Sequence, residues 1–385
     1  YKARKLENVP SFNGRAVGFF SYDIIRQYEN PPNTPENDLD IPDMHFLLTD
    51  EIIRFDHKTQ KIITIVNIHA DGNIVQQYKK ASMRLLDIRE EMADLSKLTQ
   101  KEQRNYRDSA KIISNISKEQ FCANVEKAKE YIKNGDIFQV VLSQRFTVET
   151  SQKPFNVYRA LRLINPSPYM YYIDFGKYQI VGASPEMLVR VENGVVQTGP
   201  IAGTRWRGKT LEEDLELEKE LLSDEKEVAE HTMLVDLGRN DIGKVSEFGT
   251  VEVTSFMQIE RYSKVMHLVS DVEGKLRGDK TAIDALLAVL PAGTLSGAPK
   301  VRAMERIDEM EKTQRGLYGG TVGYLGVDGN INTCMAIRRV LFRHGKAYVQ
   351  AGAGIVADSV PEKEYEETKH KALAVVNAIQ EAAKL

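Results

Sequence analysis

The chain has 385 residues, 42% of them hydrophobic and 28% charged, with a formal net charge of −3, which is the composition of an ordinary soluble globular protein. The balanced charge gives no basic footprint for nucleic acid, and no apolar run approaches the roughly 18 residues that cross a bilayer. We therefore expect a cytoplasmic protein. The two cysteines, Cys122 and Cys334, are far apart and lack the spacing of a zinc site or a disulfide framework.

The first 116 residues predict a β-rich part followed by a linker. Three β-branched and aromatic runs, GRAVGFFSYDII, HFLLTDEIIRFD and KIITIVNIHAD, predict strands, and a helical pattern follows to Ser96. We predict a β-rich subdomain at 1–100, a linker at 101–116 and a larger domain at 117–385 packed intimately against the first. Because the chain opens with Tyr1 rather than Met, we expect the first subdomain to lack its start.

Two elements early in the larger domain have clear signals. Ser117 with Gln120 three residues later predicts the start of a helix. The run IFQVVLSQRFTV that comes after this helix predicts a strand with Val140 on a core face and Gln139 and Arg145 on a polar face.

A helix predicted from Asp224 to Leu237 places a carboxylate where an apolar side chain is expected. Glu230 lies in the middle of the apolar arc and Glu227 at its edge. A buried carboxylate needs a cation, because an unpaired buried charge costs several kcal/mol. A buried arginine or lysine is one candidate. The other is a metal shared with Glu364 and Glu367, which repeat the same spacing; an all-carboxylate set without histidine or thiolate suits Mg²⁺.

The closing segment, QAGAGIVADSVPEKEYEETKHKA, predicts a strand end, a glycine turn and a helix. Ser359 with Glu362 forms a potential capping box, and Pro361 suits the first helical turn. The apolar arc of the helix consists of Tyr365, Thr368, Ala372, Val375, Val376 and Ile379. The charged stripe that borders this arc, predicted to be half-buried, consists of Glu364, Glu367 and Lys371. The alternative is a solvated flank with a weak Glu-to-Lys pair.

Further polar positions point to a site for an anionic small molecule. The turn LPAGTLSGAPK ends at a predicted helix N-terminus, whose free backbone N–H groups suit an anion. Two strands joined through Asp328-Gly329 place Arg338 between apolar neighbours on one strand face, where it needs a carboxylate from the protein or from a ligand. His267 lies on another apolar strand face, as a core or a functional histidine. The residues alone thus indicate Mg²⁺-dependent chemistry on a carboxylated small molecule, with a small-molecule sensor domain as the alternative.

The motifs PIAGTRWRG, LPAGTLSGAPK, AIRR and the closing segment, in this order and spacing, closely resemble the chorismate-utilising enzymes, and among them the family of anthranilate synthase large components. The match runs from about Ser117 to the C-terminus, and the GFFSYD region resembles the same family more weakly. The resemblance implies an α+β fold in which large β-sheets pack as a sandwich with helices outside. It also implies a lyase of tryptophan biosynthesis that converts chorismate and ammonia to anthranilate and pyruvate.

The resemblance implies roles for particular residues. The implied Mg²⁺ ligands, direct or through water, are Glu227, Glu230, Glu364 and Glu367. The implied catalytic residues are Glu186 as the acid for the departing 4-hydroxyl, His267 as the acid/base, Gln139 and Thr294. The implied substrate contacts are Tyr318, Arg338, Gly352, Gly354, Lys371, Thr204 and Ala202.

Two of these positions separate ammonia-using from other relatives. Isochorismate and salicylate synthases carry a lysine base where this chain has Gln139, and glutamine cannot deprotonate water. Typical aminodeoxychorismate synthases of the folate pathway carry a nucleophilic lysine in PIKGT, whereas this chain has Ala202 in PIAGT. The two residues favour anthranilate formation; the alternatives are an aminodeoxychorismate synthase large component and a non-catalytic tryptophan-binding regulatory protein.

The segment NPSPYMYY resembles the tryptophan feedback segment of the family, with Pro168, Tyr169, Met170 and Cys334 as the implied pocket residues. The alternative is an ordinary buried turn and strand. The other half of that pocket, a short serine-containing motif near the amino terminus, is not found in this sequence. Nor can a glutaminase be assembled around Cys122 or Cys334, so we expect a separate glutamine amidotransferase subunit to supply ammonia.

Overall fold

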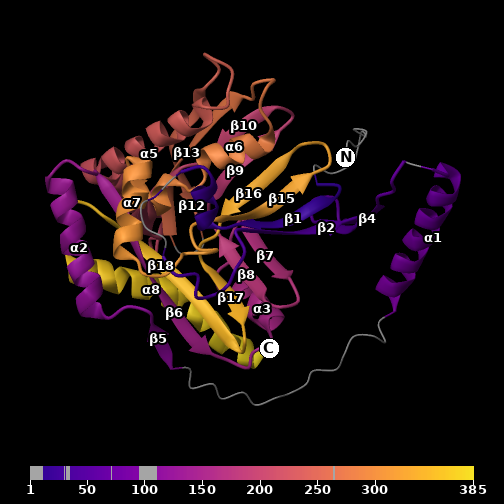
Figure 1. Cartoon of the computed structure of the whole chain (residues 1–385), viewed down its shortest axis with the longest axis horizontal. Helices are drawn as coiled ribbons and strands as arrows, with labels where there is room; N and C mark the ends of the chain where they lie inside the picture. The colour runs from indigo at the N-terminus through magenta and orange to yellow at the C-terminus, as the bar shows by residue number, and fades with distance from the viewer. Residues whose placement is uncertain (1–11, 30, 32–34, 71, 95–110, 263–264) are drawn as a thin grey trace.

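The computed structural model describes residues 12–29, 31, 35–70, 72–94, 111–262 and 265–385 (Figure 1). Within these residues, two large antiparallel sheets and a two-stranded hairpin form the β structure. The nine-stranded sheet has the order β11-β13-β10-β9-β16-β15-β1-β2, with β12 added beside β13. The seven-stranded sheet has the order β14-β6-β18-β17-β8-β7, with β5 added beside β6.

The strands of the nine-stranded sheet are β1 (Arg15–Phe20), β2 (Met44–Thr49), β9 (Met187–Glu192), β10 (Val195–Thr198), β11 (Ile201–Trp206), β12 (Glu252–Arg261), β13 (Val265–Lys275), β15 (Thr321–Gly326) and β16 (Ile331–Met335). Those of the seven-stranded sheet are β5 (Ile112–Ser114), β6 (Gln139–Glu149), β7 (Tyr169–Asp174), β8 (Gln179–Ser184), β14 (Gly297–Ala298), β17 (Arg339–Arg343) and β18 (Lys346–Ile355). The hairpin pairs β3 (Glu51–Asp56) with β4 (Lys61–Val66).

The α-helices are α1 (Ile74–Ala93), α2 (Lys118–Lys133), α3 (Pro154–Ile164), α4 (Leu211–Ser223), α5 (Glu225–Gly243), α6 (Ala282–Val289), α7 (Lys300–Met310) and α8 (Pro361–Glu381). Short 3₁₀ turns are η1 (Tyr22–Gln27), η3 (Gly293–Leu295) and η4 (Ala382–Lys384). No helix within the described ranges is long and apolar enough to span a bilayer.

The two large sheets pack face to face, and helices cover their outer faces. Phe19 of β1 and Val322 of β15 share one buried cluster with Ile180 of β8 and Leu341 of β17, which places this core between the sheets. Helices α3 and α8 cover one part of the outer face of the seven-stranded sheet, and α2 and α7 cover another. Helices α5 and α6 cover the nine-stranded sheet. The predicted sandwich with helices outside is confirmed.

Helix α8 packs as the apolar arc predicts, but its start differs from the prediction. Ala372, Val375 and Ile379 are buried in the cluster beneath α3 and α8. The helix begins at Pro361 without a side-chain cap, because Ser359 accepts a hydrogen bond from the backbone N–H of Val356 (3.1 Å). The predicted capping box is therefore wrong, whereas the place of Pro361 in the first turn is confirmed.

The amino-terminal strands join the larger part of the chain rather than forming a sheet of their own. Strand β1 pairs with β15 on one side and β2 on the other. The β3–β4 hairpin and α1 extend away from the two sheets (Figure 1), and the ion pair of Arg84 with Glu51 (2.8 Å) ties α1 to β3. The division at residue 100 stays a prediction. Of the predicted linker at 101–116, residues 101–110 lie outside the described residues, and Ile112–Ser114 forms β5.

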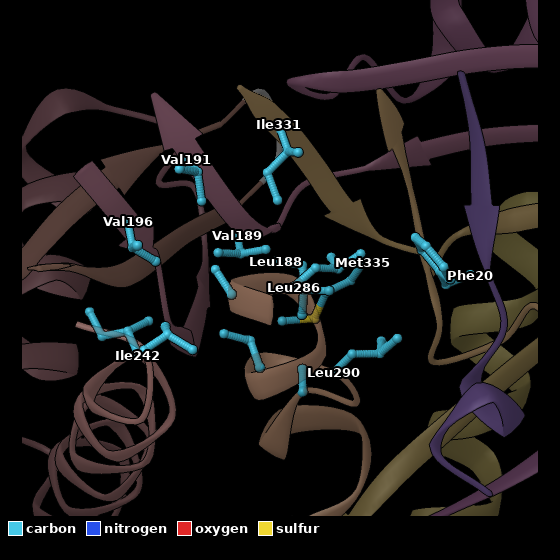
Figure 2. Close-up of a cluster of buried hydrophobic side chains, with 14 of the residues drawn as sticks. Phe20, Leu188, Val189, Val191, Val196, Ile242, Leu286, Leu290, Ile331 and Met335 are labelled. Carbon is cyan, nitrogen blue, oxygen red and sulfur yellow. The ribbon is translucent and has the colours of Figure 1, made fainter. Parts of the chain in front are cut away.

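A second core lies between the nine-stranded sheet and helices α5 and α6, next to the candidate site. Figure 2 shows Leu188, Val189 and Met335 of β9 and β16 facing Leu286 and Leu290 of the α6 segment. These residues fix the position of α6 and of the turn that follows it, and this turn carries Thr294, one of the predicted site residues.

Truncating this core should be costly. We expect Leu188→Ala to lower the free energy of unfolding by about 2–5 kcal/mol, because Leu188 is fully buried and a cavity would remain. Denaturant titration would measure the loss. Leu222→Ala, at an exposed position on α4, is the control and should change stability by less than about 0.5 kcal/mol. A similar effect of both substitutions would contradict the packing.

Candidate active site

Two of the predicted site residues lie where the chain crosses from one sheet to the other. Glu186 lies in the connection between β8 of the seven-stranded sheet and β9 of the nine-stranded sheet. Arg338 lies between β16 and β17, which belong to the nine- and seven-stranded sheets. The expectation that Arg338 lies within a strand is wrong: β16 ends at Met335, and Arg338 has a left-handed backbone with φ 47°. The crossovers bring these side chains to the seam between the sheets.

Glu186 is a carboxyl group arranged to hold a proton. Its side chain is buried, and burial raises its pKa to about 8, although nearby Arg338 opposes the shift. Its Oε1 atom has no hydrogen-bond partner among the described residues. Glu186 faces a small cavity of about 30 Å³, also lined by Thr294, Met335 and Gly199. A protonated carboxyl group with one oxygen free of protein partners can act as an acid toward a bound molecule.

The side chain of Arg338 is half-buried, and its guanidinium makes no ion pair or hydrogen bond within the described ranges. Burial lowers its pKa, and Glu186 and Tyr262 are the groups whose charge opposes this shift. Glu186 is largely protonated near neutral pH, so it does not neutralise the guanidinium. The described parts of the chain therefore do not supply the carboxylate that Arg338 needs. A guanidinium without a protein partner can bind the carboxylate of a ligand through two parallel hydrogen bonds.

His267 on β13 is held with one ring nitrogen toward the protein. Its Nδ1 lies 3.2 Å from the carbonyl oxygen of Gly203 and 3.0 Å from the hydroxyl of Thr204. Because a carbonyl oxygen can only accept, Nδ1 carries the proton and Nε2 is left with a lone pair. Burial lowers the pKa of His267, so the ring is neutral near pH 7 and can serve as a base.

The PIAGT segment lies at the start of β11, and a shift in the pairing of this strand positions Thr204 beside His267. The pairing of β11 with β13 shifts between Ala202 and Thr204, and Gly203 at the shift has φ 72°. A Cβ at Gly203 would lie 3.3 Å from Oε2 of Glu227. The glycine thus lets α5 approach the strand and brings Glu227 close to the Thr204–His267 pair.

The four predicted metal ligands come from two helices. Glu227 on α5 pairs with Arg205 (3.3 Å), and Glu230 accepts a hydrogen bond from Gln139 (3.2 Å). Glu367 on α8 is exposed and pairs with Lys371 (2.6 Å), so the prediction that this stripe is half-buried is wrong for these two residues.

Glu364 on α8 is half-buried, as predicted. Lys226 on α5 lies within electrostatic range of both Glu230 and Glu364, which places the two carboxylate pairs near each other. Within the described ranges, no group of three or more histidine, cysteine, aspartate or glutamate side chains is arranged to hold a metal.

The donor chemistry nevertheless fits a hard divalent cation. All the candidate ligands are carboxylate oxygens, which Mg²⁺ prefers. Burial and then the neighbouring Glu230 raise the pKa of Glu227, while Arg205 opposes the shift. Burial likewise raises the pKa of Glu364, and Glu367 adds to the rise. A bound cation would relieve this crowding of negative charge.

Two glycines on β18, Gly352 and Gly354, leave the backbone open beside other predicted site residues. A Cβ at Gly352 would lie 2.6 Å from the hydroxyl of Tyr318, and a Cβ at Gly354 would lie 2.7 Å from Nε2 of Gln139. Lys371 donates a hydrogen bond from Nζ to the carbonyl oxygen of Gly352 (3.1 Å). The structure therefore brings Tyr318, Gly352 and Lys371 together, and brings Gln139 together with Gly354.

The residues predicted for a tryptophan pocket do not all lie on the same face of the seven-stranded sheet. Tyr169 packs with buried Cys334 in the core between the sheets, and its hydroxyl donates to Asn332 (3.1 Å). Met170 packs on the opposite face, beneath α3 and α8, and Pro168 is exposed before β7. The pocket therefore stays a prediction.

Two residues near the site were not singled out from the sequence. The ring of Tyr262 meets His267 edge to face at 5.6 Å, and Arg338 and Glu186 lie within its electrostatic range. Arg205 supplies the cation that pairs with Glu227. Arg205 lies within the PIAGTRWRG motif, and Tyr262 directly follows β12. No spacing rule connects Tyr262 to the turn between β16 and β17, or Arg205 to a carboxylate on α5.

Comparisons with known proteins agree on one family. The family pattern described as chorismate binding enzyme matches residues 1–377. Anthranilate synthase component 1 from Acetivibrio thermocellus is 62% identical over 100% of this chain and 79% of its own. The protein of the same name from Aquifex aeolicus is 50% identical over 97% of this chain and 76% of its own.

The solved structures include a close relative of the same kind. The crystal structure of anthranilate synthase component I from Streptococcus pneumoniae is 45% identical, has a TM-score of 0.86, and covers 97% of this chain and 83% of its own. Together with the buried acid, the oriented histidine and the arginine at the seam of the sheets, these matches show that the chain belongs to the chorismate binding enzymes, in the family of anthranilate synthase component I.

Proposed function

We propose that the chain is a lyase that converts chorismate and ammonia to anthranilate and pyruvate, the reaction that begins tryptophan biosynthesis. The observation that carries this proposal is the set of Glu186, Arg338 and His267 at one seam: a protonated acid, an unpaired cation and a neutral base. An acid, a base and a carboxylate-binding cation are what replacement of a ring hydroxyl and later loss of a ring proton require.

The residues divide the chemistry between them. Arg338 binds a carboxylate of chorismate, and Tyr318 with the backbone of Gly352 borders the substrate beside it. Ammonia adds at C2 of the ring while Glu186 gives its proton to the departing 4-hydroxyl, which leaves as water. In the second step Nε2 of His267 takes the C2 proton as the C3–O bond breaks and the ring becomes aromatic. The side chain leaves as the enolate of pyruvate, which takes up a proton to give pyruvate.

We propose that Glu227, Glu230, Glu364 and Glu367 hold Mg²⁺, directly or through water. The ion would supply neutralisation of a second substrate carboxylate, which reduces the charge that the added nucleophile meets. Burial and a neighbouring carboxylate raise the pKa values of Glu227 and Glu364, and a divalent cation would favour the ionised forms of both groups, which supports a metal at this position.

We further propose that a glutamine amidotransferase subunit supplies the ammonia. We also propose that tryptophan is a feedback inhibitor that binds near Tyr169 and Cys334, and that the protein works in the cytoplasm. The names of the relatives contain the words "component 1", which supports a second component. Ala202 at the position of the lysine nucleophile supports anthranilate over aminodeoxychorismate as the product.

The deciding experiment is an assay of the purified chain with chorismate, Mg²⁺ and ammonium salts, followed by anthranilate fluorescence. We expect anthranilate from ammonium without a partner, and glutamine-dependent turnover only after the partner is added. Aminodeoxychorismate as the product would move the chain to the folate pathway. Isochorismate would contradict the choice of nucleophile, and tryptophan binding without any turnover would indicate a regulatory protein.

The pKa shifts predict a bell-shaped dependence of kcat/KM for chorismate on pH at saturating ammonia. Glu186 must be protonated, so turnover should fall as the pH rises past about 8, the pKa to which burial raises this group. His267 must be neutral, so turnover should fall on the acid side only below the ordinary histidine pKa of about 6.5, because burial lowers it. A basic limb that Glu186→Gln leaves unchanged would contradict the assignment.

Loss of a carboxylate from the proposed metal site should weaken Mg²⁺ binding. We expect Glu230→Gln to raise the dissociation constant for Mg²⁺ at least about 10-fold, measured by calorimetry, and to raise the Mg²⁺ concentration needed for turnover in parallel. Glu225→Gln, an exposed glutamate in the first turn of the same helix, is the matched control. Equal Mg²⁺ affinity in both variants would remove Glu230 from the ligand set.

A further inference from the structure

A row of buried polar side chains crosses the seven-stranded sheet on the face that packs against the other sheet. Arg145 on β6 pairs in register with Gln350 on β18, and Arg339 on β17 pairs with Gly182, which in turn pairs with Tyr171 on β7. Val340 pairs with Val349, so Arg339 and Gln350 occupy the next position along the same two strands. The row therefore continues across five strands.

Each of the four polar side chains in this row has a buried atom with no hydrogen-bond partner within the described ranges. These atoms are Nη1 of Arg145, Nε of Arg339, Oε1 of Gln350 and the hydroxyl of Tyr171. Three of the four are donors, since the pKa of Tyr171 is raised well above its ordinary value by burial and the phenol keeps its proton. Such atoms are rare in folded proteins, and three donors without a partner in one row indicate a common acceptor.

The row also holds excess positive charge. The exposed fraction of Arg339 is 2%, and its partners in the described parts of the chain are the carbonyl oxygen of Tyr348 (3.2 Å) and the ring of Tyr318 (6.0 Å). Arg145 forms an ion pair with Asp38, and no carboxylate within these parts pairs with Arg339. Of these two buried guanidinium groups, only that of Arg145 is therefore paired with a carboxylate within the described parts of the chain. Burial lowers the pKa of Arg339 to about 10, and the charge of Arg145 adds to this shift. A buried cation without a counter-charge is costly.

We propose that the inter-sheet row binds one small monovalent inorganic anion, such as chloride, between Arg339, Arg145 and Tyr171. The anion supplies the missing charge and accepts from the three free donors. Gln350 borders the site but does not donate to it, because its amide N–H is directed to the hydroxyl of Ser143 (2.9 Å). None of the three proposed anion contacts is a proposed substrate contact, although the Arg339 guanidinium lies 6.0 Å from the ring of Tyr318, and occupancy of the anion site does not depend on turnover.

The position of this site gives it a structural role. Arg339 directly follows Arg338, whose backbone is left-handed and whose carbonyl oxygen accepts a hydrogen bond from Ala183 (3.2 Å). An anion on Arg339 would hold the first residue of β17 against the opposite sheet. It would thereby stabilise the crossover from which Arg338 extends.

The test uses the full chain and halide ions as probes. In crystals soaked in bromide, we expect an anomalous peak within hydrogen-bond distance of Nε of Arg339 and Nη1 of Arg145. In solution, we expect the melting temperature to rise by about 2–3 °C when gluconate is replaced by chloride, at constant ionic strength, at ten times the dissociation constant. Ordered water without bromide at this position, or equal melting temperatures in both salts, would overturn the proposal.

Two variants locate the effect in solution. Tyr171→Phe removes one donor and should raise the chloride concentration needed for a given rise in melting temperature about 5–10-fold. Tyr172→Phe is the matched control, since Tyr172 packs on the other face of the sheet and should respond like the parent chain. Arg339→Met should abolish the response if it folds. A response of Tyr171→Phe equal to that of Tyr172→Phe would place the anion elsewhere and contradict the site.

Discussion

Replacing Glu186 by glutamine should lower kcat for anthranilate formation by about 10²–10⁴-fold while leaving the fold and chorismate binding intact. The amide has nearly the shape of the protonated acid, and burial keeps Glu186 protonated near neutral pH, so the substitution removes the transferable proton and little else. Steady-state kinetics would measure kcat and KM, and the melting temperature would report the fold.

Glu192→Gln is a suitable control for the Glu186 variant. Glu192 ends β9, the strand that begins directly after Glu186, and it lies outside the predicted site. We expect this variant to keep the kinetics of the parent chain. A Glu186→Gln chain that retains kcat within a few-fold would show that another group protonates the leaving hydroxyl.

Replacing Arg338 by methionine should lower kcat/KM for chorismate by about 10²–10³-fold, with most of the loss in KM. The guanidinium has no ion pair or hydrogen bond within the described parts of the chain, so its proposed partner is the substrate carboxylate. For the same reason, we expect the melting temperature of Arg338→Met to be unchanged or higher, because removing a buried, unpaired cation relieves a desolvation cost.

Arg162→Met, at an exposed position on α3, controls for the loss of a positive charge and should leave KM unchanged. Two results would contradict the role of Arg338: a KM for chorismate equal to that of the control, or a marked loss of stability, which would indicate a protein partner instead.

Local patterns in the sequence predict the elements of the fold well. The apolar arc of α8 and the cap of α2 at Ser117 are found as predicted, because each depends on residues within a few helical turns. Ser359 does not cap α8, and the cause is again local: its hydroxyl accepts a hydrogen bond from the backbone N–H of Val356, three residues earlier.

The arrangement of the site depends on contacts that local patterns do not contain. The polar face of β6, with Gln139 and Arg145, lies between two sheets, and only the sheet order shows that it is buried. Arg338 was expected within a strand because its neighbours alternate, but the chain leaves the sheet there. Its unpaired state and the proton on Glu186 depend on burial by segments far away in the sequence, so spacing alone identifies neither.

The crossovers that carry Glu186 and Arg338 determine how the site can be lost. Each residue is held between a strand of one sheet and a strand of the other, so neither sheet alone contains the acid and the cation in their working arrangement. A partly unfolded molecule could keep most of its helices and strands and still have no catalytic geometry, because the two groups are aligned only while the sheets are docked. The site is therefore a property of the interface between the two sheets.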